Sequence, residues 1–544
     1  MAIENFKYNS LEEGEIRVLV LDAAAQEGDA LSGALVVVKH IPGDHITRYD
    51  AMSYTWGDQS DPEYIDLRHP RPIGHDKSCI CNKESSGSLA IGRNLASALR
   101  KIRHQSNNQI LWADSICINQ QDLDERAAQV LRMRDIYKYA QRVIGRSAIE
   151  IIAAKREALA GTVDIHTMVE FSNARSFSAL RHLRDFFSLV AYTHACEVTE
   201  PRDRVFALLG LAEGGFTSEI VVDYRKDVKD VHRDALVRAS TYHQDLKLMS
   251  LCDSASEPTW IPDLERIQLQ RPMTYGRAAL CCAENGHAFT KEQLLLQGIR
   301  CDYISELVGP QGSQNCQAQL QTTVLEAAQR FLGPHPETWD FQKVQQFSLM
   351  LHVNDFFIHP PFINKTHQQL AQRISTHSKT LGGQLAHLTY YMHNRSIYLT
   401  KMGYIVLGPR DCQPNDLIVV FLGCHLPMVL RSIEDGEYKL KGPCAHPALL
   451  AGEAILGEMP KGWRLSYSRR GENSVFEDPE GKRHHIDPRL DGMPVPEEWE
   501  LRWRNNGTPF WYIAAEDRWT NFDPRISLEG LRKRGVRVND YVLR

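Results

Sequence analysis

The sequence has no hydrophobic run long enough to cross a membrane. Its most apolar stretch, "DLIVVFLGCHLPMVL" (416–430), is shorter than the about 20 residues that a transmembrane helix needs, and His425 and Pro427 interrupt it. A sheet strand followed by a turn is the better interpretation. We therefore expect no membrane span.

A secretory signal and a disulfide framework are also missing. The chain opens with "MAIENFKYNSLEEGE", which is polar and acidic and does not match a typical signal peptide. The 12 cysteines make no regular framework for a chain of 544 residues, and an intracellular protein would keep them reduced. The cytoplasm is the expected location.

The sequence lacks an excess of basic charge. The net charge is −5, so no global positive field attracts nucleic acid or an anionic membrane, and we expect neither as a partner. There is also no Gly-rich phosphate loop and no Ser-His-Asp order. The composition itself is that of a globular protein, with 43% hydrophobic and 24% charged residues, and the length predicts two or three domains.

The first 145 residues alternate strand-like and helix-like patterns, which predicts an α/β layered domain with a largely parallel sheet. The predicted strands are 16–21, 34–40, 51–56, 63–67 and 109–116, and the predicted helices are 94–103 and a long helix from 123 that Asn119 or Asp122 can cap. The stretch 68–92 is rich in turn-forming residues and is predicted to be a surface loop.

After residue 150 the predicted secondary structure changes twice. A mainly helical middle region is expected after the first domain, with helices over 150–161, 180–192 and 201–215 and a second helical block over 318–400; β-rich patterns return from 401. The expected domains are 1–150, 151–400, 401–458 (packing on the preceding regions), 459–491 and 495–527.

The last two of these segments form an internal repeat. Six residues recur at a fixed offset of 36 positions: Pro460, Trp463, Gly471, Asp487, Pro488 and Arg489 match Pro496, Trp499, Gly507, Asp523, Pro524 and Arg525. Identities at one offset indicate two copies of a small unit.

Three stretches of the first domain resemble the fungal heterokaryon incompatibility (HET) domain. They are "YDAMSYTWGD" (49–58), "NLASALRKIR" (94–103) and "LWADSICINQQDLDERAAQVLRMRDIYKYAQRV" (111–143). Weaker resemblances to larger members of the family extend over most of 16–455. The resemblance implies a role in non-self recognition between fused fungal cells and in programmed cell death.

The resemblance also implies a TIR-like fold, some of whose members cleave NAD. NAD would then be a substrate, and we expect no bound cofactor. One departure is visible: the family follows its long helix with a "W-L-G" strand, whereas "RVIGRSAIE" (142–150) lacks the Trp. We therefore expect an altered or incomplete edge of the domain there.

The repeats resemble WW modules. Trp463 to Pro488 and Trp499 to Pro524 have the spacing of the Trp and Pro that pack together in such a module. His485 and Asn521 stand where the second, ligand-contacting Trp falls. Because proline-rich ligands dock between aromatic rings, we expect no proline-rich ligand, although Phe510, Trp511 and Tyr512 keep the second repeat partly aromatic.

The candidate catalytic residues are Asp114 and Glu125. A carboxylate after a strand lies where an α/β sheet binds its ligands, but Asp114 could equally cap the next turn. Glu125 could act as an acid, a base or a ribose ligand, or it could interact with the helix dipole and complete a capping box with Asp122. The structural interpretation is favoured for both. The residues predicted to line such a site are Tyr54, Trp56, Asp58, Asn119 and Arg126.

Cysteine chemistry is not expected. Cys117 has no neighbouring His in sequence that would activate it, so a packed thiol is the better interpretation. Cys79 and Cys81 with His69 and His75 do not have the spacing of a zinc module, and no metal is expected.

Two functions remain open. One is an effector of incompatibility, with or without NAD-type cleavage. The other is a non-catalytic interaction protein, or a diverged inactive relative, that contacts protein partners or itself through the repeats.

Overall fold

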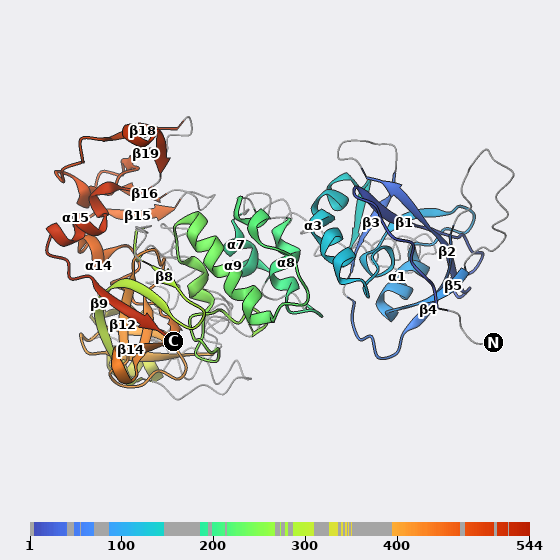
Figure 1. Cartoon of the computed structure of the whole chain (residues 1–544). Helices are drawn as coiled ribbons and strands as arrows, with labels where there is room; N and C mark the ends of the chain where they lie inside the picture. Colours follow the sequence, from blue (N-terminus) through green and yellow to red (C-terminus); the bar gives the residue numbers. More distant parts are fainter. Residues whose placement is uncertain are drawn as a thin grey trace. The chain divides into compact units, whose positions relative to one another are not determined.

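The structure of the chain is a computed structural model (Figure 1). The described residues are 5–40, 48–69 without 55, 86–145, 185–193, 198–266 without 211, 213 and 214, 287–308, 326–335, 394–467, 474–504, 509–520 and 522–544, with scattered positions between 273 and 350. They divide into an N-terminal unit (Met1–Arg184, Glu197–Glu213, Val221–Asp227) and a C-terminal unit (Asp185–Cys196, Gly214–Ile220, Val228–Arg544).

The N-terminal unit is built on a seven-stranded sheet in the order β5-β4-β2-β1-β6-β3-β7. The strands are β1 (Glu15–Leu21), β2 (Leu31–Lys39), β3 (Asp50–Ser53), β4 (Glu63–Arg68), β5 (Ser86–Ile91), β6 (Gln109–Trp112) and β7 (Arg142–Gly145). Pairs β1–β2, β1–β6 and β4–β5 are antiparallel, and pairs β2–β4, β3–β6 and β3–β7 are parallel. The α/β class is confirmed, but the sheet is mixed.

The expectation of a largely parallel sheet was wrong because one connection is short. Only residues 22–30 join β1 to β2, and a parallel crossover needs about a dozen residues or more. The prediction of a loop over 68–92 was wrong for its last residues, because they form β5, which pairs with β4. Residues 70–85 lie outside the described part of the chain. The sequence of β5, "SGSLAI", has few β-branched residues, so β5 is a strand because it pairs with β4 rather than because of its residue propensities.

Helices complete the N-terminal unit. They are α1 (Arg93–Ile102), α2 (Asp114–Cys117), α3 (Leu123–Tyr139) and α8 (Asp203–Leu209). The α1 helix contacts β2 and β4, and its Leu95, Leu99 and Ile102 are buried at the spacing of one helical face. The predicted strand 109–116 is shorter than expected, because the chain turns into α2 after Ala113.

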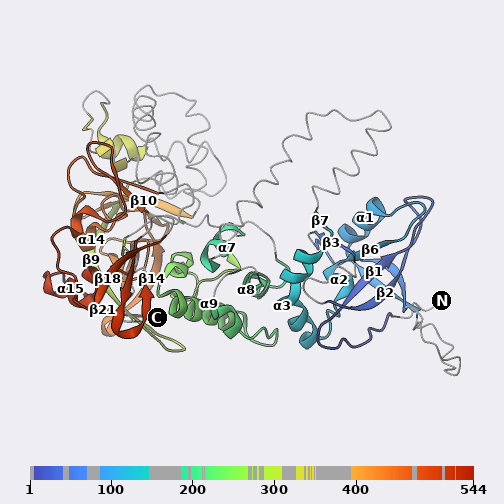
Figure 2. The same ribbon diagram turned by 90° about the horizontal axis from the view of Figure 1, so that it is seen from above.

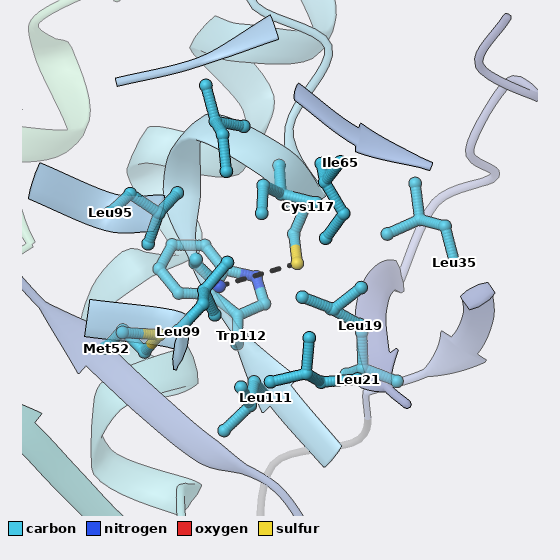
Figure 3. Packing of buried hydrophobic residues seen from close by; sticks show 14 of the residues in the cluster. Leu19, Leu21, Leu35, Met52, Ile65, Leu95, Leu99, Leu111, Trp112 and Cys117 are labelled. Atoms are coloured by element: carbon cyan, nitrogen blue, oxygen red, sulfur yellow. Dashed lines mark hydrogen bonds between the residues drawn. The ribbon is translucent and has the colours of Figure 1, made fainter. Parts of the chain in front are cut away.

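The core of this unit lies around Trp112 and Cys117 (Figure 3). Trp112 is fully buried, and leucines from β1, β2, β6 and α1 surround it and Cys117. Ala113 N donates to Cys117 Sγ (3.5 Å), which helps to hold the α2 turn against the sheet. The apolar half of "LWADSICINQ" is therefore a buried strand, as expected.

The C-terminal unit contains a ring of strands. The strands of its large sheet are β8 (Ala288–Phe289), β9 (Leu294–Leu307), β10 (Arg395–Thr400), β11 (Ile405–Pro409), β12 (Leu417–Phe421), β13 (Met428–Ser432), β14 (Glu437–Pro443) and β21 (Asn539–Leu543). Strand β9 pairs with β12, β12 with β13, β13 with β14, β14 with β21, and β21 with β9 again. These five pairings close a barrel, and Figure 2 shows β21 beside β9 and β14.

Strand β9 closes the ring because it is long. Its first residues pair with β21, its middle with β12 and its last with β10. At Gly298 a Cβ atom would lie 2.9 Å from Phe421 Cδ1 and 2.9 Å from Val419 Cγ1, so only glycine lets the two strands approach there. The β-rich pattern predicted from 401 corresponds to β11 to β14, but β9 and β10 lie within 151–400, where a mainly helical region was expected.

Helices and 3-10 turns pack beside the barrel within this unit. They include α7 (Phe186–Tyr192), η1 (Gly215–Glu219), α9 (Val228–His243), η2 (Lys247–Leu251) and α14 (Glu453–Leu456). The Phe216 ring lies edge-on to Phe186 (5.7 Å between centroids) and His243 (5.4 Å). The helices expected over 150–161 and from 351 to 393 lie outside the described residues. No helix in the described part is long and apolar enough to cross a membrane.

The repeats form two three-stranded antiparallel sheets. The first consists of β15 (Arg464–Tyr467), β16 (Ser474–Glu477) and β17 (Arg483–His484), and the second of β18 (Trp499–Trp503), β19 (Pro509–Ile513) and β20 (Arg518–Thr520). In each, the repeated Asp-Pro-Arg motif forms a 3-10 turn (η6, Pro488–Leu490, and η8, Pro524–Ile526) capped by its Asp. The internal repeat of the sequence is therefore a repeat of structure.

The arginine of each motif attaches its repeat to the segment before it. Arg489 is paired with Asp487 and donates to Gly457 O (2.7 Å) and Ala451 O (2.7 Å), next to α14. Arg525 is paired with Asp523 and donates to Leu490 O (3.2 Å) in the first repeat. The two repeats are thus attached in series.

Candidate functional site

Asp114 lies where two parallel strands end. Strands β3 and β6 pair in parallel, so the residues that follow them lie at the same edge of the sheet. The Tyr54 hydroxyl donates to Asp114 Oδ1 (3.0 Å), and Trp56 Nε1 donates to Oδ2 (2.9 Å). The structure therefore brings together three of the predicted site residues.

Ser115 completes this cluster. Its backbone N–H donates to Asp114 Oδ1 (2.8 Å), and its Oγ lies 2.5 Å from the Tyr54 hydroxyl oxygen. Burial raises the pKa of Asp114, and the hydrogen bonds from Trp56, Tyr54 and the Ser115 backbone act against that rise. Burial also raises the pKa of Tyr54 well above that of a free tyrosine, so its hydroxyl stays a donor.

Glu125 belongs to a different set of contacts. Its Oε1 accepts from Arg17 Nη1 (2.6 Å) and from Asn119 N (2.7 Å), and its Oε2 accepts from Arg17 Nη2 (2.9 Å). The side chain of Arg17 is 1% exposed and that of Glu125 is 10% exposed. Both carboxylate oxygens are thus held by protein donors in a buried ion pair.

Arg17 connects Glu125 to the turn that contains Cys117. Its guanidinium also donates to Cys117 O (3.2 Å) and to Asn9 O, and it lies 4.9 Å from the centre of the Tyr8 ring. The Tyr8 hydroxyl donates to Ile116 O (3.0 Å). This arrangement fixes β1 to the α2–α3 connection, which is a structural role.

The predicted capping box is half present. Asp122 caps α3 by accepting from Asp124 N and Glu125 N (3.0 Å each). In the reciprocal bond, the Glu125 carboxylate accepts from Asn119 N instead of from Asp122 N, because it is turned toward Arg17. The Asn119 side chain accepts from Gln121 N (3.2 Å), a local turn bond.

Arg126 faces a third group of residues. It donates to Asp203 Oδ2 (3.0 Å), its guanidinium lies 3.7 Å from the centre of the Tyr224 ring, and the Tyr224 hydroxyl donates to Asp203 Oδ1 (2.6 Å). Burial raises the pKa of Asp203, and the bonds from Tyr224 and Arg126 oppose it. Arg126 therefore anchors α8 and the segment 221–227 to α3.

Asp58 lies in an exposed turn of its own. Its two oxygens accept from Ser60 N (2.9 Å) and Ser60 Oγ (2.9 Å), and these bonds lower the pKa of Asp58. The preceding Gly57 has φ +69°, and a Cβ atom there would lie 2.4 Å from Asn94 Nδ2. The sequence "WGD" thus forms a tight turn whose Trp reaches Asp114 and whose Asp does not.

The seven predicted residues divide into four groups. Tyr54, Trp56 and Asp114 contact one another; Glu125 and the Asn119 backbone share Arg17; Arg126 joins Asp203; and Asp58 bonds Ser60. Sequence reasoning missed Arg17, Ser115, Asp203 and Tyr224. A buried arginine inside the apolar run "IRVLVL" was the one available signal, because such a charge needs a carboxylate partner.

Cys117 is a packed thiol. It is 1% exposed, and burial raises its pKa to about 12, which keeps it protonated and unreactive near neutral pH. Within the described residues, no group of three or more His, Cys, Asp or Glu side chains is placed to hold a metal ion. Cys79, Cys81 and His75 lie outside those residues, and His69 Nε2 is 2.9 Å from Lys7 O.

Two segments of the chain match known protein families. Residues 49–170 match the family described as heterokaryon incompatibility protein (HET), and residues 299–459 match the Het-6 β-barrel domain. The first match contains the Asp114 cluster and Glu125. The second contains most of the strand ring, from β9 to β14, but not β21.

A curated fungal protein also resembles the chain. Heterokaryon incompatibility protein 6, OR allele, of Neurospora crassa is 34% identical over 105 residues, which is 18% of this chain and 14% of the Neurospora protein. The matched part is thus a small share of that relative. Taken with the two domain matches, it shows that the chain contains a segment of the heterokaryon incompatibility (HET) domain family and, in its second half, a segment of the Het-6 β-barrel domain family.

Proposed function

We propose that this protein acts in fungal non-self recognition and cell-death signalling, and that its HET domain works through protein contacts. The observation that carries this proposal is the Arg17–Glu125 pair. A general acid or base must reach its substrate, whereas both oxygens of Glu125 are occupied by buried donors. Asp114 likewise accepts hydrogen bonds at both oxygens.

Cell killing in a fungal host tests this proposal. We expect expression of the full chain to cause an incompatibility reaction that does not require an ionised residue 114. Asp114→Asn keeps an acceptor for Trp56 and should leave the reaction intact when the protein is folded. A folded Asp114→Asn protein that no longer kills would contradict the proposal.

The second candidate function is TIR-like cleavage of NAD. Asp114 favours it, because it lies at the carboxyl ends of two parallel strands and burial raises its pKa, which suits proton transfer. The parallel β6-β3-β7 part of the sheet supports a TIR-like expectation, and the antiparallel β1–β2 pair departs from it. Purified protein that is forced to self-associate and consumes NAD would support this candidate; unchanged NAD would remove it.

The second repeat carries the proposed contact with a partner. Tyr512 and Trp519 face each other across β19 and β20, and Trp519 is 62% exposed. Arg502 lies 3.6 Å from the Tyr512 ring centre, and Arg504 lies 5.3 Å from Phe510 and 5.4 Å from Trp519. Trp519 is two residues before the position where a WW-like module was expected to place its second Trp.

The first repeat provides an internal comparison for this face. Leu465 pairs with Phe476 as Leu501 pairs with Trp511, so Glu477 and Arg483 occupy the positions of Tyr512 and Trp519. The same small fold therefore forms without those rings. This supports a role for them in binding a protein partner in the cytoplasm, where we expect the chain to act.

The matched experiment gives the second repeat the residues of the first. Tyr512→Glu with Trp519→Arg should leave the fold unchanged and weaken the incompatibility reaction. Arg518→Lys, on the other face of β20, is the control. An unchanged reaction in the double variant would contradict a partner contact at this face.

A further inference from the structure

The C-terminal unit contains a cavity of about 430 Å³ beside the barrel. It lies between the segment that follows η2, the first residues of β10, the end of β11 and the end of β14. Its wall carries three basic side chains, Arg395, Arg410 and Lys441, and two acidic ones, Asp253 and Asp411. The volume is in the range of small-molecule sites, which runs from roughly 300 to 1,000 Å³.

Arg410 brings an unpaired charge to this wall. The residue is half-buried, and its guanidinium forms no hydrogen bond or ion pair with any residue in the described part of the chain. Its backbone is held in place, because Arg410 O accepts from the Tyr398 hydroxyl (2.8 Å). A guanidinium presents a rigid fork of donors that matches a carboxylate or a phosphate, and none of these donors is used here.

Lys441 adds a buried cation with spare donors. Its side chain is 8% exposed, and its ammonium pairs with Asp411, whose side chain is 51% exposed. An ammonium has three N–H donors, and Asp411 is its single partner among the described residues. A buried ammonium that faces a cavity with donors unused is costly unless an acceptor enters the cavity.

A purely structural ion pair of the same barrel looks different. Arg431 donates to both oxygens of Asp416 (2.9 and 2.8 Å), and Asp416 Oδ2 also accepts from Gln413 N (2.7 Å). Asp416 is enclosed, with its side chain 4% exposed, although that of Arg431 is 27% exposed. The Lys441–Asp411 pair has neither the two-pronged geometry nor the closure.

We propose that this cavity binds a small polar metabolite through an oxyanion, a phosphate or a carboxylate, held by Arg410 and Lys441. Asp411 is the counter-ion of Lys441 when the cavity is empty and yields part of that contact when the anion enters. The rest of the ligand then faces Asp253, Asp411 and Ser254. Hydroxyl or amino groups on the ligand would donate hydrogen bonds to these acceptors. Burial raises the pKa of Asp253.

The test is a calorimetric titration of the full chain with inorganic phosphate and, separately, with malonate, at constant ionic strength. We expect saturable binding of at least one of the two anions, and the stronger of the two identifies the oxyanion. Arg410→Gln and Lys441→Met should each weaken that binding by about tenfold or more. Both variants should stay folded, because the Arg410 side chain has no partner among the described residues and Met fills the place of a buried Lys stem.

Lys439→Gln is the matched control. Lys439 lies on the same strand as Lys441 but outside the cavity, where it pairs with Glu257 (2.7 Å). Binding by this variant should equal that of the unmodified protein. The proposal is overturned if neither anion binds, or if Arg410→Gln and Lys441→Met bind as well as Lys439→Gln does.

Discussion

Arg17 and Glu125 lie 108 residues apart in sequence and form a two-pronged ion pair in the interior of the HET domain. Arg17 is on β1, at the centre of the sheet, and Glu125 is in the first turn of α3. The pair also fixes the backbone of Cys117 and Asn119 between them. It therefore holds strand β1 to the turn and helix of the third HET-like block (111–143).

Glu125→Ala should destabilise the HET domain strongly. The change leaves the Arg17 guanidinium buried without its carboxylate, and breaking a buried pair in this way costs about 3–5 kcal/mol. Hydrogen exchange of peptides covering residues 109–139, followed by mass spectrometry, measures the loss within this domain. Asp124→Ala is the control: its side chain is 80% exposed and pairs with Arg225 at the surface, so exchange should change little. Equal effects at the two positions would contradict the structural role of Glu125.

The stability around Asp114 should fall as pH rises above the ordinary aspartate pKa of about 4. Burial raises the pKa of Asp114 in the folded protein, so between the two values the folded state binds more protons than the unfolded chain. The contribution is present at low pH and is lost as pH rises through the folded pKa. Asp114→Asn should remove this decline, which hydrogen exchange of residues 109–117 at about pH 4 and about pH 7 can detect. A decline of the same size in the variant would show that another group causes it.

Cys117 should resist alkylation in the folded protein. Its pKa is raised to about 12, compared with about 8.5 for a free thiol, and its side chain is inside the core. Iodoacetamide labelling near neutral pH, read by peptide mass spectrometry, should modify Cys117 only after urea is added. Labelling at equal rates with and without urea would argue against the packed thiol.

Arg489→Lys should detach the first repeat from the barrel. Lysine cannot reproduce the two-pronged bond to Asp487 together with the bonds to Gly457 O and Ala451 O. Because Arg489 and Asp487 are 4% and 6% exposed, we expect a local loss of about 3 kcal/mol and faster limited proteolysis of residues 459–527. Arg518→Lys, which alters an exposed pair with Glu516, should digest like the unmodified protein. Protection of the Arg489→Lys chain would contradict attachment through this residue.

Tyr541→Ala should open the barrel. Tyr541 on β21 is 3% exposed, and its ring lies 5.6 Å from Phe421 and 5.3 Å from Tyr438. Removing a buried ring of this size costs on the order of 3 kcal/mol, so hydrogen exchange in β9 and β14 should speed up. Asp540→Ala, at the exposed neighbouring position, is the control. Unchanged exchange in β9 would show that β21 does not complete the ring.

The sequence allowed good prediction where one strand or helix determines its own pattern. The periodicity of 94–103 and 123–139, and the cap at Asp122, depend on residues within one turn of each other, and the structure confirms them. The apolar runs of β1 and β2 were equally clear. Their antiparallel pairing does not follow from the α/β alternation of the sequence; it follows from the short connection between them.

The site was harder to predict because its contacts join distant segments. Tyr54 and Trp56 reach Asp114 only because β3 and β6 pair in parallel with a particular register. Arg17 and Glu125 depend on how α3 packs on β1. The sequence indicated which polar side chains lie within an apolar run. The partner of each depends on how distant segments pack, and no local sequence pattern encodes that packing.

The order in which the barrel can form follows from the pairing of β21. Residues 539–543 connect β14 to β9 and follow both repeats in the sequence, so the five-strand ring cannot close until they have been synthesised. Until synthesis reaches those residues, β9 and β14 present unpaired edges, which are prone to pair with other chains. A chain shortened after residue 527 would therefore be a candidate for aggregation or degradation, even though every residue of the matched barrel segment is present.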